Sequence, residues 1–549
     1  MAATVRCGTR SMPRVPQSSL VRLAASPEAV VAAATAHLDA RPADAPGHLE
    51  IAEPPDRQPA IALGLDLAPA GGGTDLQITS TGEIDLPFFG WFFRPLVRIA
   101  HRRARNHVVA TIEAVLADRP LPPPPNSVVG LPPVAFGPEQ ATFIATASAA
   151  TAIVSFAGAL FGQLSGPISD SFGASDATIG NALAITRLGA LFALFAIAIA
   201  DRRGRRRSIL IGVVGSAIAC GLSAVAPNLL AFTTVQVLQR GLVGTTATVA
   251  FLAVVEEAPE GARAYAASML ALAGGFGFSF AVVALPLADL ASWSWRLVFV
   301  LGAATIVFVP VVARSLEETS RYTALTARAD VARGRARDIF DFHQRRFLLL
   351  GVVAFLTSAF SAPSSQLTNK YLTDVHNYSN TNIAIFRAVT TGIPGLVGVV
   401  LGGRLAEARG RRPVAAIALA LATATQMIFF LGGGLTLWVM SAVSIFMAGA
   451  GGIALGALDA ELFPTEVRAT SNAMLYVIAV LGSATGLVVA GGLADALGGL
   501  GHSVALTGIG SLLVALIVVP LLPEPAARSL DEVSPTQATR PDDEYGPAP

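Results

Sequence analysis

Two arginines within long apolar stretches are the side chains of this sequence most suited to binding chemistry. Arg240 lies in VQVLQRGLVGTTA, twelve residues after Asn228, which is about 18 Å along a helix. Arg187 lies in an earlier apolar stretch, ALAITRLGALF. A charged side chain at such depth in a bilayer costs about 3 kcal/mol or more, so its presence indicates a function. A ligand with a carboxylate or phosphate group suits such a guanidinium, because the ligand neutralises its charge.

Amide side chains accompany these arginines. Gln236 and Gln239 lie within about one helical turn of Arg240. A later stretch, SAPSSQLTNKYL, carries Gln366 and Asn369. All four amides can hydrogen-bond a polar solute, although an ordinary polar helix end explains the later pair equally well.

A third arginine, Arg387 in IAIFRAVTT, lies about one turn inside its apolar stretch. A long side chain in this position can extend its charged end to the membrane surface, so we expect Arg387 to reach water. No aspartate, glutamate or histidine lies near the middle of any apolar stretch. The sequence therefore offers cations at depth but no side chain that titrates there.

These residues belong to apolar stretches that predict an all-α membrane protein. Of the 549 residues, 53% are hydrophobic and 14% are charged, whereas soluble proteins carry roughly 25% charged residues. Each stretch is long enough for a bilayer core of about 30 Å. We expect twelve transmembrane helices, at residues 141–163, 178–200, 208–226, 229–255, 264–288, 295–313, 346–368, 382–403, 413–433, 435–457, 469–494 and 502–522.

Polar segments divide and flank the twelve helices. The polar loop 314–345 separates six helices in residues 141–313 from six in residues 346–522. Residues 121–140 form a proline-rich, semi-rigid linker. The tail, residues 523–549, has a composition typical of disorder.

Residues 1–120 predict a small α+β domain in water. SSLVRLA is typical of a strand, and SPEAVVAAATAHL predicts a helix with Ser26 as N-cap and Pro27 in its first position. The segments on either side of AGGG alternate apolar and polar residues, as in a β-hairpin. A long helix with an aromatic start and a basic middle follows in PFFGWFFRPLVRIAHRRARNHVVATIEAVL.

The order of strands and a long final helix resembles the helix-grip, polyketide-cyclase-like lipid-binding fold. This resemblance implies a lipid or apolar ligand for residues 1–120. Two other interpretations of the basic helix stay open. It lies on the inner membrane surface, attracted by anionic headgroups, or it is a solvated helix of the domain.

Arginine is concentrated in alternate loops, which predicts the orientation. Arginine-rich loops follow the second, fourth, sixth, eighth and tenth apolar stretches. The opposite loops carry Arg296 and Lys370, the only lysine of the chain. The positive-inside rule then places both termini in the cytoplasm of a multi-pass cell-membrane protein, with Arg187 in the outer half of its helix.

Two motifs recur at nearly constant offset. ADRRGRRR at 200–207 aligns with AEARGRRP at 406–413, and EEAPEGARA at 256–264 aligns with ELFPTEVRA at 461–469. A weaker correspondence pairs Asp170 with Asp374. Three coincidences at offsets of 204 to 206 residues indicate two parallel six-helix repeats. The motif residues are Asp201, Arg202, Gly204, Arg205 and Arg206; Glu407, Gly410, Arg411 and Arg412; Glu256, Pro259 and Arg263; and Glu461, Pro464 and Arg468.

The repeated turn has a direct physical interpretation. Gly204 and Gly410 permit a tight connection between antiparallel helices. The arginines hold the turn outside the hydrocarbon. Asp201 and Glu407 end a helix next to these cations and can pair with an arginine or a helix N-terminus.

These motifs resemble the major facilitator superfamily, in its pattern G-x-x-x-D-[RK]-x-G-R-[RK]. The E-x-x-P-x-x-x-R pairs, together with SWSWRLVF and LEETSRY, resemble its sugar- and metabolite-porter branch. This chain departs from the pattern at Ile197, in place of glycine, and at Glu407, in place of aspartate. The acidic site of the family's first helix has no match either.

The resemblance implies a secondary transporter, not an enzyme, that works by alternating access. It implies that the acid–arginine motifs latch the halves in one state and separate in the other. The run Arg240, Gly241 and Gly244 resembles a motif associated with proton coupling, which implies symport of a sugar or organic acid. Anchoring of the loops alone is the alternative role for the motifs.

Three functions stay open: transport of a small polar or anionic metabolite by alternating access, export of drugs or metabolites, and ligand sensing through residues 1–120. The duplicated motifs favour transport, because an anchor needs no duplicated latch. A net charge of +1 gives no indication of a nucleic-acid partner, and the sequence has no nucleotide-binding P-loop. Cys7 and Cys220 are isolated, so no disulfide framework is predicted, and we expect no cofactor or metal.

Overall fold

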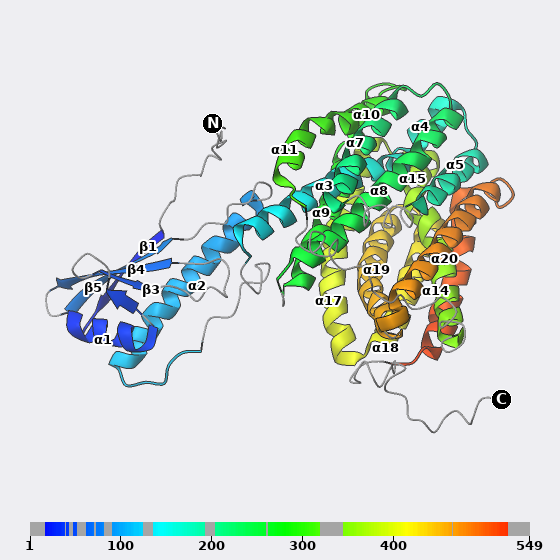
Figure 1. The fold of residues 1–549 in the computed structure, drawn as a ribbon. Coiled ribbons are helices and arrows are strands. Elements are labelled where there is room, and N and C mark those ends of the chain that lie inside the picture. The colour runs from blue at the N-terminus through cyan, green and yellow to red at the C-terminus, as the bar shows by residue number, and fades with distance from the viewer. Residues whose placement is uncertain are drawn as a thin grey trace, which may run out of the picture. The chain divides into compact units, whose positions relative to one another are not determined.

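The computed structural model describes most of the chain (Figure 1). The described residues are 17–38, 40–42, 48–51, 62–70, 73–81, 90–123, 136–192, 204–259, 262–318, 344–463 and 465–524. Packing divides the chain into two compact units. One comprises residues 1–149, 251–271 and 312–321, and the other comprises residues 150–250, 272–311 and 322–549.

The N-terminal part contains a five-stranded antiparallel sheet in the order β1-β5-β4-β3-β2. The predicted first strand, capped helix, hairpin and long final helix are all present. Ser26 caps the first helix, because its Oγ accepts a hydrogen bond from the amide of Ala29 at 3.3 Å. The elements are β1 (Gln17–Leu23), α1 (Pro27–Leu38), β2 (Ala40–Pro42), β3 (His48–Ile51), β4 (Ala62–Ala70), β5 (Gly73–Thr81) and α2 (Gly90–Leu116).

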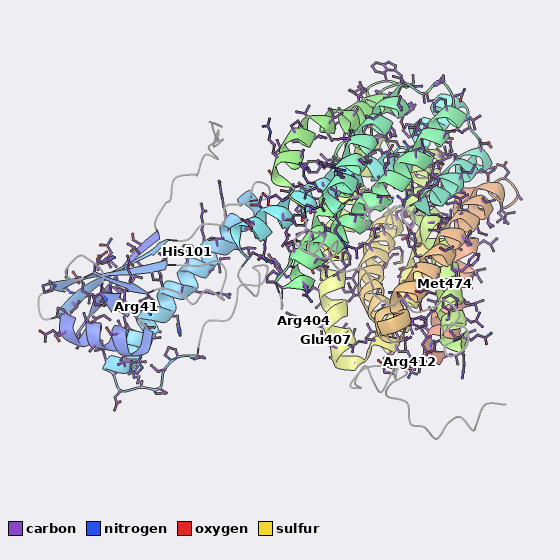
Figure 2. All side chains as sticks on the ribbon, viewed as in Figure 1. Arg41, His101, Arg404, Glu407, Arg412 and Met474 are labelled. Atoms are coloured by element: carbon purple, nitrogen blue, oxygen red, sulfur yellow. The ribbon has the colours of Figure 1, made fainter. Side chains whose placement is uncertain are left out.

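The two helices of this part contribute to one apolar core with the sheet. Leu65 and Ile78 of the central strands are fully buried, as are Val30 of α1 and Ile112 of α2. His101 of α2 is buried and its Nδ1 lies 2.9 Å from Ser80 Oγ (Figure 2). The lipid ligand implied by the helix-grip resemblance stays a prediction.

The membrane region contains eleven described helices that are long and apolar enough to cross a bilayer. The remaining expected helix, which is the second along the chain (178–200), begins as α5, and its residues 193–200 lie outside the described residues. The first half consists of α3 (Pro138–Gln163), α4 (Ser165–Phe172), α5 (Asp176–Gly189), α7 (Arg205–Ala224), α8 (Leu229–Glu257), α9 (Arg263–Val283), η1 (Leu285–Asp289), α10 (Trp295–Ala304), η2 (Thr305–Phe308) and α11 (Val309–Ser315).

The second half follows the same plan. Its elements are α14 (Gln344–Gln366), α15 (Thr368–His376), α16 (Asn380–Arg387), η3 (Ala388–Gly392), α17 (Ile393–Arg409), α18 (Arg411–Leu431), α19 (Leu435–Glu461), α20 (Thr465–Gly492), α21 (Leu500–Leu513), η4 (Val514–Val518) and η5 (Val519–Leu521). The turn η3 is a π-helix inserted between α16 and α17.

The backbone confirms the internal repeat. Gly204 has φ 96° and ψ 147°, and Gly410 has φ 98° and ψ 149°. Both values of φ favour glycine, so the two equivalent turns need this residue. Ser175 and Ser379 cap equivalent helices, and each accepts a hydrogen bond from the amide three residues later.

Helix breaks occur at equivalent places in both halves. The helix α3 ends at Gln163 and α4 starts at Ser165, while α14 ends at Gln366 and α15 starts at Thr368. The intervening residues are Leu164 and Leu367. The break of α14 directly follows Gln366, which lines the cavity described next.

Candidate functional site

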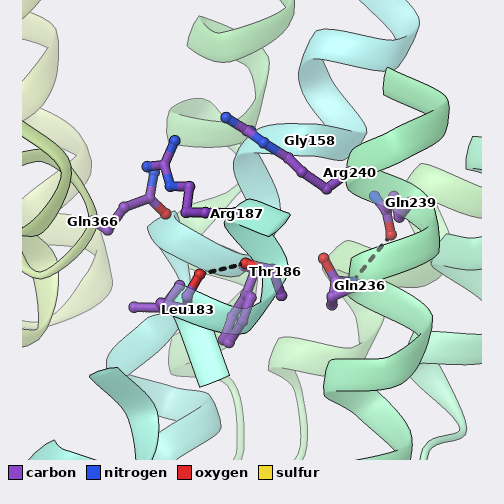
Figure 3. Close-up of a pocket in the computed structure, with 9 residues that line it drawn as sticks. Gly158, Leu183, Thr186, Arg187, Gln236, Gln239, Arg240 and Gln366 are labelled. Carbon is purple, nitrogen blue, oxygen red and sulfur yellow. Dashed lines mark hydrogen bonds between the residues drawn. The ribbon is translucent and has the colours of Figure 1, made fainter. Parts of the chain in front are cut away.

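A cavity of about 330 Å³, part of it open to solvent, lies between α3, α5, α8 and α14 (Figure 3). The lining combines apolar and polar side chains from both halves. The residues that line it are Gly158, Phe161, Leu183, Thr186, Arg187, Gln236, Gln239, Arg240 and Gln366.

The structure brings Arg187 and Arg240 together in this cavity (Figure 3). Arg187 is in the last turn of α5, and Arg240 is in the middle of α8. Gly189 allows this approach, because a Cβ there would lie 2.2 Å from the carbonyl oxygen of Val237 and 3.2 Å from Cβ of Arg240. Two arginines that are 53 residues apart in the sequence therefore lie in one cavity.

The two guanidinium groups lack partners for their charge within the described residues. Neither donates a hydrogen bond to, or forms a salt bridge with, any described side chain or carbonyl, and both are partly exposed to the cavity. No aspartate, glutamate or histidine is among the lining residues. The cavity is consequently a positive site that suits an anion.

Two glutamines of α8 form a network behind the cations. Gln236 donates to Gln239 Oε1 at 3.0 Å and to Ser223 Oγ at 2.9 Å. Gln239 donates to the carbonyl oxygen of Ala157 at 2.7 Å. Gln239 has no exposed surface and Gln236 has 5%. These bonds fix α8 against α3 and α7, so both amides hold the wall in place as well as lining it.

Gln366 and Asn369 differ in their positions. Gln366 lines the cavity, and its carbonyl oxygen accepts a hydrogen bond from Ser165 Oγ at 3.1 Å. Asn369 is buried outside this lining, where Nδ2 donates to the carbonyl oxygen of Gln163 at 2.8 Å and to its Oε1 at 2.9 Å. Asn369 therefore joins the second half to the first.

The expectation that Arg387 reaches water is wrong. Its side chain is 8% exposed, and Nε donates to Asn369 Oδ1 at 3.0 Å. Arg387 is one of the buried residues of α16, and its partner Asn369 belongs to α15, so the side chain faces the protein interior rather than lipid. Distance from the end of an apolar stretch does not indicate which face of a helix a residue occupies.

The structure describes the repeated turns in part. Asp201, Arg202 and Pro464 lie outside the described residues, and the side chains of Glu461 and Arg468 are not described. Arg205 is buried and Arg206 half-buried, Glu256 and Pro259 are half-buried, and Arg263 is exposed. The latch role of these residues stays a prediction.

In the second turn, the sequence analysis missed a carboxylate. Glu524 Oε1 accepts a hydrogen bond from the amide of Arg411 at 3.0 Å, and Oε2 accepts one from the amide of Arg412 at 2.9 Å. The Arg412 guanidinium donates to the carbonyl oxygen of Leu522 at 3.2 Å. Glu407 is exposed (Figure 2). Glu524 follows the last apolar stretch, and nothing in its sequence neighbourhood indicates that it returns to this turn.

A second missed feature joins the halves beyond the cavity. Lys370 Nζ lies 2.5 Å from Asp374 Oδ2 and 3.1 Å from Asp176 Oδ1. Asp289 accepts hydrogen bonds from the amides of Asn380 at 2.9 Å and Thr381 at 2.7 Å. We call this region, defined by Asp176, Asp289, Lys370, Asp374 and Asn380, the closed end. In the sequence, the feature that points to this region is Lys370, the only lysine of the chain.

Comparison with known proteins gives a family match that covers the membrane region. A sequence model of the Major Facilitator Superfamily matches residues 143–457 and, in a second match, residues 388–544. The citrate–proton symporter of Klebsiella pneumoniae is 26% identical over 223 residues, which are 38% of this chain. The chain spans about half, 47%, of that curated relative.

Solved structures of transporters share the fold. A bacterial homolog of the human lysosomal transporter Spinster, inward-facing and unoccupied, aligns with a TM-score of 0.60 at 18% identity, covering 71% of this chain and 98% of that one. The inward-open xylose transporter XylE from E. coli aligns with a TM-score of 0.57 at 17% identity, covering 71% and 98%. At these identities the likeness concerns the fold alone.

Proposed function

Because the chain belongs to the Major Facilitator Superfamily, it is a secondary transporter and not an enzyme, and we propose that its substrate is a small organic anion. The substrate binds in the cavity between Arg187 and Arg240. Its carboxylate or phosphate oxygens accept hydrogen bonds from both guanidinium groups.

The observation that carries this proposal is the pair of adjacent cations without a counter-charge among the described residues. Burying one charge in a protein costs several kcal/mol of desolvation free energy unless an opposite charge nearby compensates for it. Two like charges in one cavity add mutual repulsion, which an anion between them converts into attraction. A neutral sugar would leave both costs in place.

The citrate–proton symporter supports the same substrate class, since citrate is a carboxylate. Proton coupling is part of the proposal, supported by that relative's name and by the likeness of Arg240, Gly241 and Gly244 to a coupling motif. The exporter and sensor alternatives have no comparable support from the cavity.

The chain is a multi-pass membrane protein, and we propose that both termini are cytoplasmic. The distribution of arginine between alternate loops supports this orientation. The closed end then faces outward, and Asn369 and Lys370 are part of the outer barrier between the halves.

Uptake into proteoliposomes tests the substrate class. The purified protein is expected to accumulate labelled citrate or phosphate in preference to labelled xylose, and more strongly with an inward proton gradient. Arg240→Ala and Arg187→Ala should each lower the uptake of the anion at least about tenfold, because each removes charge-assisted hydrogen bonds of about 1.5–3 kcal/mol. The proposal is contradicted if the protein transports xylose and Arg240→Ala leaves that transport unchanged.

The matched control is Arg404→Ala, which removes an exposed arginine at the far end of α17 (Figure 2). This variant should transport the anion at the parental rate. Size-exclusion chromatography of all variants verifies that each one is folded.

A further inference from the structure

Arg387 is a buried cation whose surroundings in the described part of the chain contain no counter-charge. Its side chain is 8% exposed and makes no salt bridge with any described carboxylate. One hydrogen bond, from Nε to Asn369 Oδ1, engages the guanidinium, while Nη2 is buried without a hydrogen-bond partner among the described residues. Such a group destabilises the fold, so its presence indicates a function.

A second unsatisfied polar group follows one turn later. Thr391 Oγ1 is buried and has no hydrogen-bond partner among the described residues. Thr391 belongs to the π-helical turn η3, which starts directly after Arg387. Turns of this kind occur frequently at functional sites, because they change which side chains face inward.

The internal repeat relates this place to the cavity. An offset of 204 residues pairs Ser175 with Ser379, which cap α5 and α16, and it pairs Arg187 with Thr391. Arg387 and Thr391 therefore occupy, in the second half, the region that delivers Arg187 to the cavity in the first half.

Asn369 covers Arg387 in this state. Its Oδ1 accepts the hydrogen bond from Arg387, and its Nδ2 donates to Gln163 of the first half. Separation of the halves at the closed end must break the bonds to Gln163. The side chain of Asn369 is then free to turn, which uncovers the guanidinium.

We propose that Arg387 and Thr391 form a second anion-binding site, which takes the carboxylate or phosphate group of the substrate when the closed end opens. This second site presupposes the proposed function. It adds a substrate-binding site in the second half to the cavity of Arg187 and Arg240. The guanidinium supplies charge and two donors, and the threonine hydroxyl supplies a third donor.

Arg387→Met and Thr391→Val test the site in proteoliposomes with labelled citrate as the probe. Arg387→Met should raise the KM for uptake about tenfold, the effect of losing one good charged contact. Thr391→Val should raise it by a smaller factor. Binding of citrate to the purified protein should change by less than about twofold in both variants, because Asn369 covers the site in the closed state.

Thermal melting separates this role from a structural one. Arg387→Met should melt at or above the temperature of the unmodified protein, because a buried charge without an anion is replaced by an apolar side chain of similar length. A KM within about twofold of the parent in both variants overturns the proposal. The proposed function fails independently, when Arg240→Ala retains citrate binding and uptake.

Discussion

The cations of the membrane region differ in what surrounds them, and this difference assigns their roles. Lys370 is 5% exposed and contacts Asp176 and Asp374. Arg187 and Arg240 face a cavity and have no such partners among the described residues. A paired cation joins the halves, whereas an unpaired cation at depth is available to a substrate. Depth in the membrane alone does not distinguish the two cases.

The residues at the closed end predict a dependence of stability on pH. Burial raises the pKa of Asp374, although the bond to Lys370 opposes the shift, and Asp176 and Asp170 add to it. A carboxyl with a raised pKa destabilises the closed end when it is ionised, and this cost disappears as the pH falls toward the raised pKa. Lys370 stays charged over this range, since Asp374 and Asp176 outweigh its burial and raise its pKa.

Acidification from neutral pH should therefore stabilise the closed end, and Asp374→Asn should remove this contribution. The contribution of Asp374 is measured from the melting temperatures of the unmodified protein and of Asp374→Asn at several pH values between 7 and 4.5. The relevant quantity is the difference between the two plots of melting temperature against pH. The curves should converge as the pH falls. Parallel curves would show that Asp374 titrates as an ordinary exposed carboxyl.

Among the elements, the turn between α17 and α18 depends on a residue distant in sequence. The carboxylate of Glu524 accepts hydrogen bonds from the first two amides of α18, where the helix dipole also favours negative charge. A Cβ at Gly410 would lie 3.1 Å from Glu524 Oε2. Glycine in this turn therefore provides both the backbone conformation and the space for the cap.

Glu524→Gln should lower the free energy of unfolding by about 1 kcal/mol, the usual contribution of a helix cap. Glu407→Gln is the matched control, because Glu407 is exposed and makes no hydrogen bond or salt bridge within the described residues. Its effect on stability should be below about 0.5 kcal/mol. Denaturant titrations of the two variants compare them directly, and equal losses would exclude the capping role.

The sequence predicts elements better than it predicts their partners. Apolar length located the membrane helices, and glycine with arginine located both turns. The break after Gln366 was not predicted, although QLS at 163–165 and QLT at 366–368 repeat at an offset of 203. The pairing of Glu524 with α18 depends on how the last helix packs, and a local pattern contains no information about it.

For the whole molecule, the repeat explains why the site draws on both halves. Arg187 and Arg240 come from the first half, and Gln366 comes from the second. The sequence indicated two similar halves but not which faces meet. The contact between α5 and α20 determines which faces of the two halves meet, because small residues in it allow the two backbones to come close.

The contact between α5 and α20 predicts how the halves are held in this state. A Cβ at Gly180 would lie 2.8 Å from the carbonyl oxygen of Leu487 and 3.0 Å from Cα of Gly491. Gly180→Ala should push the two helices apart and shift the population toward the state that is open at the closed end. Gly492→Ala is the matched control, since a Cβ there meets no atom within 4 Å.

Distances between spin labels report the shift. Thr178 and Asn382 are exposed, occupy equivalent places in the two repeats, and lie next to the closed end on α5 and α16. Labels on cysteines at both positions, in a chain with Cys7 replaced, should give a longer distance distribution in Gly180→Ala than in Gly492→Ala. Addition of citrate should alter the distribution of the control, because the substrate joins side chains of both halves. Equal distributions in the two variants would show that this helix contact does not control the opening.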